Sequence, residues 1–174
     1  QSSLGAALAE RGIVSAFSRL HPMLLNDHVL HGLGHCDAVG KTVSIDLREP
    51  DEVQWRRYRS NHRRNIVKLQ KQGVTGELSA RPEDLAAFRE LYAQTMDRLD
   101  AAASYRFSDE YFEKLMRAME FDMHLFVCRQ GSKVICGGLF SSCNGMIQYH
   151  LGGTDADYLR SAPSKLLFDS VRKW

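Results

Sequence analysis

The chain has 174 residues, of which 44% are hydrophobic and 25% charged, which is the composition of a folded globular protein long enough to bury a core. Lysine and arginine number 23 against 21 for aspartate and glutamate, so the net charge of +2 does not by itself indicate nucleic-acid binding. The four cysteines form no C-x-x-C pair, and neither a signal peptide nor an apolar stretch of about 20 residues is present. These features predict a reduced, cytoplasmic protein without a transmembrane segment, in which Cys128, Cys136 and Cys143 are buried in apolar runs.

The first 50 residues are expected to contain one helix and three short strands. Leu4, Ala7 and Leu8 have helical spacing within residues 4–11. Apolar or alternating runs at residues 14–20, 29–33 and 42–47 favour strands. The sequence starts at Gln1 and its last helical segment has no stop signal, so we expect a piece of a longer chain.

Three helices are expected in the middle of the chain. The first spans residues 52–72, with Trp55 and Leu69 on its inner face and Gly73 as its stop. The second spans residues 82–100 and begins with a proline followed by acidic residues. The third begins after Ser108, whose hydroxyl suits a helix N-cap.

An antiparallel meander follows these helices. Three strands at residues 124–129, 133–143 and 146–151 are joined by Gln130-Gly131-Ser132 and by Asn144-Gly145, which is a strong hairpin signal. A glycine pair, a polar loop and a helix from residue 163, with Leu166, Leu167 and Val171 on its inner face, complete the order. This order predicts an α+β fold with a central, mostly antiparallel sheet flanked by helices.

A dense basic segment lies in the first of the three helices. Residues 51–73 hold seven basic and two acidic side chains. On one helix, Arg57, Arg64 and Lys68 would form a stripe that continues to Lys71, with Arg63 on its flank. Such a face could hold the phosphates of tRNA, a nucleotide-linked precursor or a cofactor. The alternative is a solvated helix whose arginines pair with the acidic residues of the segment 74–122.

The end of the third meander strand and the loop after it form a second candidate site. Gly152 and Gly153 would let a ligand or another backbone approach closely. Ser161, Ser164 and Lys165 lie where the next helix begins, and its free N–H groups could hold a phosphate or carboxylate. The alternative is an ordinary glycine turn and helix cap. A Q/R-x-x-G-x-G/A loop, which commonly binds the pyrophosphate of acetyl-CoA, is absent from the sequence.

Two further segments are weaker candidates. His21, His28, His31, His35 and Cys36 invite a metal hypothesis, but core-type residues separate them and no second cysteine is near, so no metal site is predicted. The segment Tyr105-Arg106-Phe107 could line the mouth of a cleft or form a packed loop.

Taken together, several motifs in a fixed order resemble the FemAB-like, or BioF2-like, acyltransferase branch of the GNAT superfamily. In chain order they are Arg19-Leu20-His21-Pro22, the segment from Trp55 through Tyr58-Arg59-Ser60-Asn61-His62-Arg63-Arg64-Asn65-Ile66, Gly73-Val74, the segment from Phe88 to Met96, and Tyr149-His150-Leu151-Gly152-Gly153-Thr154-Asp155. The resemblance implies that residues 1–50 end a first GNAT-like half. Residues 51–174 would be a second GNAT-like domain that lacks its last strands.

The resemblance also implies a function. The family moves acyl or aminoacyl groups from acyl-CoA or aminoacyl-tRNA, used as co-substrates without a tightly bound cofactor, to amine acceptors that include peptidoglycan precursors. Donor-binding groups would come from Leu151, Gly152 and Gly153 and from the loop to Lys165, and Tyr149 or His150 would relay a proton. Side chains alternate along a strand, so only one of these two can face the cleft. The alternatives are a non-catalytic tRNA- or phosphate-binding module and a degenerate GNAT scaffold.

Overall fold

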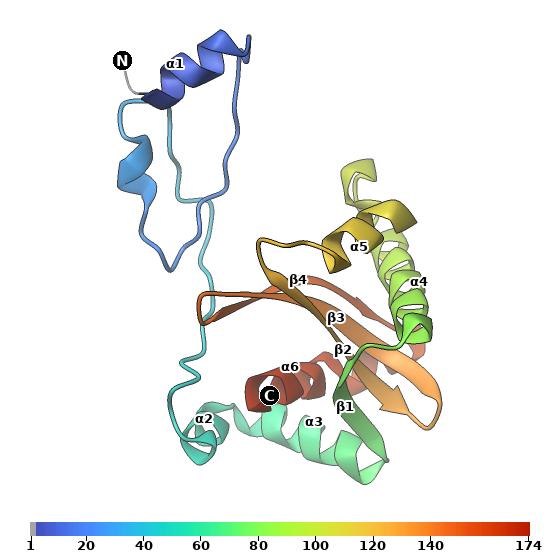
Figure 1. The fold of residues 1–174 in the computed structure, drawn as a ribbon. Coiled ribbons are helices and arrows are strands. Elements are labelled where there is room, and N and C mark those ends of the chain that lie inside the picture. Colours follow the sequence, from blue (N-terminus) through green and yellow to red (C-terminus); the bar gives the residue numbers. More distant parts are fainter. Residues whose placement is uncertain (1–2) are drawn as a thin grey trace. The chain divides into compact units, whose positions relative to one another are not determined.

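The computed structural model describes residues 3–174 and divides the chain into two units (Figure 1). Unit 1 comprises Gln1–Ile45 and unit 2 comprises Asp46–Trp174. The chain is thus divided between Ile45 and Asp46.

Unit 1 contains α1 (Ser3–Glu10), which confirms the first expected helix, and the short 3-10 helix η1 (Asp27–Leu30). The three strands expected in this region are wrong, because the described part of unit 1 contains none. The side chains of Val14, Phe17 and Val43 are exposed. A hydrophobic pattern stabilises a strand only where a neighbouring strand supplies hydrogen bonds and a second layer covers its apolar face.

Unit 2 contains a four-stranded antiparallel sheet in the order β1-β2-β3-β4. Its elements in chain order are α2 (Asp51–Arg57), α3 (Ser60–Lys71), β1 (Val74–Ser79), α4 (Pro82–Arg98), η2 (Ala103–Tyr105), α5 (Asp109–Met116), β2 (Asp122–Gln130), β3 (Lys133–Cys143), β4 (Met146–Thr154), η3 (Ala156–Ser161) and α6 (Ser164–Lys173). The expected α+β class, with helices flanking an antiparallel sheet, is confirmed.

The meander forms as its turn residues predict. Asn144 and Gly145 have φ values of 48° and 75°, the pair of positive angles that a two-residue hairpin of this kind requires. Ser108 caps α5 through its hydroxyl, which accepts a hydrogen bond from the Tyr111 amide at 3.3 Å. Both local predictions are confirmed.

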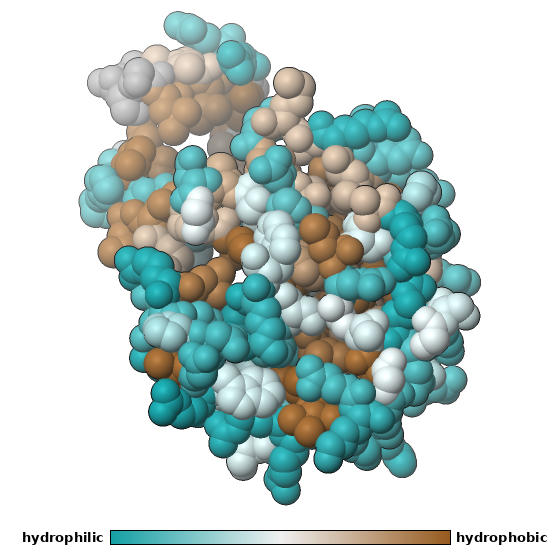
Figure 2. Space-filling view, turned by 60° about the horizontal axis from the view of Figure 1, so that its bottom comes forward, coloured by the Kyte–Doolittle hydropathy of each residue, from teal (hydrophilic) through white to brown (hydrophobic). Residues whose placement is uncertain are grey.

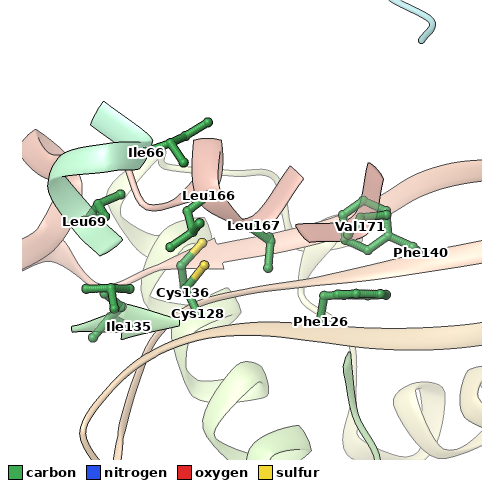
Figure 3. Packing of buried hydrophobic residues seen from close by; sticks show 11 residues of the cluster. Ile66, Leu69, Phe126, Cys128, Ile135, Cys136, Phe140, Leu166, Leu167 and Val171 are labelled. Atoms are coloured by element: carbon green, nitrogen blue, oxygen red, sulfur yellow. The ribbon is translucent and has the colours of Figure 1, made fainter. Parts of the chain in front are cut away.

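Helices cover both faces of the sheet. In Figure 1, α3 and α6 lie on one face and α4 and α5 on the other, and each pair encloses its own core. The core on the α6 face contains Ile66, Leu69, Phe126, Cys128, Cys136, Phe140, Leu166, Leu167 and Val171 (Figure 3). The core on the α4 face contains Phe88, Leu91, Tyr92, Phe112, Leu125, Val127, Val134 and Leu139. The inward residues expected for the last helix are therefore buried as predicted.

The prediction of one long helix at residues 52–72 is wrong in one respect, because the segment is divided at Tyr58 and Arg59 into α2 and α3. Tyr58 has an extended ψ of 138°, its ring stacks on His62 and its hydroxyl accepts a hydrogen bond from Arg172 of α6 at 3.1 Å. Arg63 of α3 donates to the carbonyls of Arg56 and Tyr58 at 2.8 and 2.7 Å. The break is thus held by tertiary contacts and not by a glycine or proline.

The strand β1 was not predicted from the sequence. Val74 and Thr75 have good strand propensity, but Gly76 and Glu77 do not. The strand forms because it pairs with β2 over its whole length. At Gly76 an added Cβ would overlap Ser170 of α6, so the missing side chain lets this helix lie close to the strand.

Candidate active site

The strand β4 carries an irregularity at His150. Its partner β3 aligns Leu139 with Leu151 but Phe140 with Tyr149, so His150 has no partner and forms a bulge. Consequently His150 and Leu151 both contact the α4 and α5 side, whereas Tyr149 contacts the α6 side. Bulges re-aim side chains and occur often beside active sites.

Tyr149 packs against the α6 face. Its ring lies 5.3 Å from that of Phe140 and 5.0 Å from that of Phe168. Burial raises the pKa of its hydroxyl. Tyr149 and His150 therefore lie on opposite faces of β4, as strand alternation requires.

His150 is exposed and its Nε2 lies 2.9 Å from the Tyr111 hydroxyl. Desolvation by its surroundings lowers the pKa of the imidazole below its usual value near 6.5. The neutral ring therefore predominates at pH 7, and a neutral imidazole can accept a proton.

The backbone of β4 presents hydrogen-bond donors at its free edge. The Asp155 amide donates to Ile135 of β3 at 3.0 Å, whereas the Thr154 amide donates to the Thr95 hydroxyl of α4 at 3.2 Å. Because N–H directions alternate along a strand, the Gly152 amide points away from β3, like that of Thr154. Within the described residues no strand pairs with β4 on that side.

The two glycines expected to end the strand lie inside it, because β4 continues to Thr154. Neither has a positive φ. A Cβ on Gly153 would lie 2.6 Å from the backbone of Leu91 and Tyr92 in α4, so a helix and not a ligand makes the close approach there. A Cβ on Gly152 would overlap the Tyr149 hydroxyl.

The loop before α6 contains η3 and then Ala162, which adopts a left-handed conformation with φ of 50°. Ser161 and Ser164 are half-buried, and neither hydroxyl makes a hydrogen bond to another described residue. Lys165 is directed toward α3, where its Nζ lies 3.1 Å from the side-chain amide of Asn65. The lysine therefore contributes to the contact between α3 and α6.

Two cysteines link the end of β4 to this loop. Cys128 of β2 and Cys136 of β3 are register partners with neighbouring sulfur atoms (Figure 3). The Cys136 Sγ lies 3.4 Å from the Thr154 hydroxyl, and the Cys128 Sγ donates to the Pro163 carbonyl at 3.5 Å. Burial raises both pKa values, that of Cys136 to about 11, so both remain protonated thiols.

The expectation for Cys143 is wrong, because this residue is exposed at the end of β3. Its apolar neighbours lie in the buried part of the strand, but the residue itself borders the Asn144-Gly145 turn, where the sheet is no longer covered.

The basic segment lines a groove of about 660 Å³ on the outer side of α3. Its lining consists of Trp55, Ser60, Arg63, Arg64, Val67, Lys68, Lys71 and Gln72. Figure 2 brings the α3 side of unit 2 forward and shows hydrophilic side chains around smaller hydrophobic patches. The helix break removes Arg57 from the expected stripe, and this residue pairs instead with Glu49 at 2.5 Å. Among the described residues, Arg64, Lys68 and Lys71 form no ion pair, so the expected pairing with the acidic segment 74–122 is not seen.

A smaller hollow of about 290 Å³ lies between α4 and the segment before α5. Arg106 and Phe107 line it, whereas Tyr105 contributes only its carbonyl to a hydrogen bond from Tyr92, at 2.8 Å.

Residues 3–174 contain no group of three histidine, cysteine or acidic side chains that could hold a metal ion. No helix in this range is long and apolar enough to cross a membrane.

The candidate active site thus lies on a four-stranded antiparallel sheet with helices on both faces, at a bulged edge strand that a loop and a helix follow. A comparison with protein families matches residues 56–174 to the acetyltransferase (GNAT) domain, so the chain belongs to this family. GNAT acetyltransferases are N-acyltransferases that use acyl-CoA as co-substrate. No curated protein matches the sequence.

Proposed function

We propose that unit 2 transfers an acyl group to an amine at the open edge of β4, beside His150. The donor is an activated acyl compound, either acyl-CoA or aminoacyl-tRNA. The acceptor is the amine of a small molecule or of a cell-wall precursor, as in the FemAB-like branch. The bulge in β4 carries the proposal, because it sets a neutral imidazole two residues from the Gly152 amide, which points outward from the edge of β4 opposite β3.

The chemistry follows from these groups. The amine nitrogen attacks the acyl carbon, and the C–S bond of a thioester or the C–O bond of an aminoacyl ester breaks as the C–N bond forms. His150 accepts the amine proton, which then passes to the leaving thiolate or alkoxide. The Gly152 amide stabilises the developing oxyanion. A positioned base of this kind contributes about 10²- to 10⁴-fold in rate.

The donor side is proposed to include Leu151, Gly152 and Gly153 together with the loop up to Lys165. In the first turn of α6 the Lys165 amide donates to the Ala162 carbonyl at 3.1 Å, whereas the amides of Ser164 and Leu166 have no partner among the described residues and suit an anionic group of the donor. Lys165 adds a positive charge beside this turn, and its contact with Asn65 fixes it against α3.

Binding should be tested first by calorimetric titration of the protein with acetyl-CoA, longer acyl-CoAs and aminoacyl-tRNA. Binding of one class and not the other identifies the donor. Absence of binding by all of them would contradict the acyltransferase proposal and favour a degenerate scaffold.

Turnover should then be compared in His150→Gln and Tyr149→Phe. With the donor that binds, His150→Gln should lower kcat at least about 100-fold at an unchanged donor affinity, because only proton transfer is lost. Tyr149→Phe is the matched control and should change kcat little, since its ring packs against α6. Wild-type turnover in His150→Gln would refute the role of this histidine.

The groove on α3 supports a second function, the binding of a polyanion such as tRNA. Arg64, Lys68 and Lys71 surround an aromatic and aliphatic floor that includes Trp55, and none has an acidic partner among the described residues. Arg63 is already engaged with the carbonyls that end α2. Its guanidinium therefore adds charge at the rim but is fixed in place.

Fluorescence anisotropy with unfractionated tRNA at several salt concentrations tests this function. The double variant Arg64→Gln, Lys68→Gln should weaken binding and reduce the salt slope by about 1 to 2, because each released phosphate contact contributes about 0.7 to 0.9. Arg57→Gln is the control, since Arg57 pairs with Glu49 and does not line the groove. Equal affinity and slope in the double variant would contradict the proposal.

A further inference from the structure

Tyr111 is held in three ways on the side of α5 that contacts β4. Its amide donates to the Ser108 hydroxyl at 3.3 Å. Its ring stacks on that of Phe107 with centroids 4.1 Å apart and planes inclined by only 13°. Its hydroxyl lies 2.9 Å from the His150 Nε2. The tyrosine is thus a rigid support and not a mobile surface side chain.

A hydrogen bond to one nitrogen of an imidazole ring determines which nitrogen remains free to contact a substrate. A hydrogen bond at Nε2 fixes the ring plane and leaves Nδ1 as the only nitrogen free to contact a substrate. Burial raises the pKa of the Tyr111 hydroxyl, so the group stays a neutral phenol. A phenol oxygen can accept a hydrogen bond from Nε2–H in both the neutral imidazole and the imidazolium, so the contact survives proton uptake at Nδ1.

We propose that Tyr111 is a positioning residue for His150, whose hydroxyl oxygen accepts the hydrogen bond from Nε2–H and thereby presents Nδ1 to the reacting amine. The last step rests on the proposed acyltransferase function, whereas the pairing of the two side chains does not. In the reaction the proton of the amine moves to Nδ1, while Nε2–H remains on the ring and stays bonded to Tyr111.

The aromatic stack connects Tyr111 through Phe107 to Tyr92, a buried residue of α4. Phe107 also stacks on Tyr92, at 6.0 Å, and the Tyr92 hydroxyl donates to the Tyr105 carbonyl at 2.8 Å. Phe107 is therefore in contact with Tyr92 of α4 on one side and with Tyr111, the partner of His150, on the other. Its aromatic residues set where the imidazole lies.

The hydrogen bond between Tyr111 and His150 can be detected by NMR without any substrate. Nitrogen-15 NMR of the histidine rings of the whole chain, with His150 assigned through His150→Gln, should give a protonated Nε2 whose proton exchanges slowly with water. In Tyr111→Phe the same proton should exchange too fast to be seen. Tyr105→Phe is the matched control, because the exposed Tyr105 hydroxyl makes no hydrogen bond to another described residue.

Turnover completes the test. With acetyl-CoA and ethanolamine as probes, or with the donor identified by calorimetry, Tyr111→Phe should lower kcat at least tenfold while the KM for the donor is unchanged. An unprotonated Nε2 in the wild-type protein, an unaltered proton signal in Tyr111→Phe, or wild-type kcat in this variant would overturn the inference. Wild-type turnover in His150→Gln, with the proton signal still dependent on Tyr111, would instead refute the proposed function and leave the pairing intact.

Discussion

Asp84 is a buried carboxylate at the start of α4, and both of its oxygens accept hydrogen bonds. It accepts hydrogen bonds from the Ser79 hydroxyl at 2.6 Å, from Arg81 at 3.0 Å and from Arg129 at 2.5 Å. Burial alone would raise its pKa, but the hydrogen bonds from Arg129 and Ser79 and the nearby positive charges outweigh it, and the pKa is lowered. The carboxylate thereby joins β1, β2 and α4.

This lowered pKa predicts a dependence of stability on pH. The folded-state pKa lies below the unfolded value near 4, so the carboxylate stabilises the fold fully above about pH 4 and loses its effect as pH falls through the folded-state pKa. Asp84→Ala should lower the free energy of unfolding by about 3 kcal/mol at pH 7, since it leaves Arg129 without its main partner. The loss should shrink toward pH 2.

Urea denaturation at pH 7, 4 and 2.5 would measure this effect. Asp122→Ala is the control, because Asp122 is exposed and forms no ion pair among the described residues. A constant difference between wild type and Asp84→Ala at all three pH values would contradict the assignment.

At the scale of elements, glycines set how closely helices approach the sheet. Gly153 faces the backbone of α4, whereas Gly152 faces the end of the Tyr149 side chain. Gly153→Ala should therefore destabilise the fold by about 2 kcal/mol or more, because two backbone segments must separate. Gly152→Ala should lower stability by less than about 1 kcal/mol, because a side chain can rotate away.

The midpoints of chemical denaturation compare the two variants directly. Equal losses of stability would show that α4 does not limit the space at Gly153. The contrast also decides how activity data are interpreted. A substitution at Gly153 acts through folding, so His150→Gln, with Tyr149→Phe as its control, is the better probe of the site.

At the scale of the whole molecule, the basic groove and the candidate active site are two separate regions of unit 2. The net charge is only +2, yet three basic side chains that form no ion pair within residues 3–174 line one groove on α3. The other candidate site is built from β4, α5 and the start of α6, which are brought together by the sheet. Both candidate sites belong to unit 2, and the family match begins at residue 56.

The sequence by itself determined the features that depend on local chemistry. The Asn144-Gly145 turn, the Ser108 cap and the inward residues of α6 follow from backbone preferences and helical spacing, which neighbouring residues fully specify. The resemblance indicated the GNAT superfamily, which the family match confirms.

Only the tertiary structure decided the rest. The break at Tyr58 depends on Arg172, which is 114 residues away, and β1 forms because β2 pairs with it. The contact of Tyr111 with His150 joins residues that are 39 positions apart and depends on a one-residue bulge. The spacing of hydrophobic residues along the sequence does not predict such contacts, because hydrogen bonds between distant segments form only once the sheet has set their register.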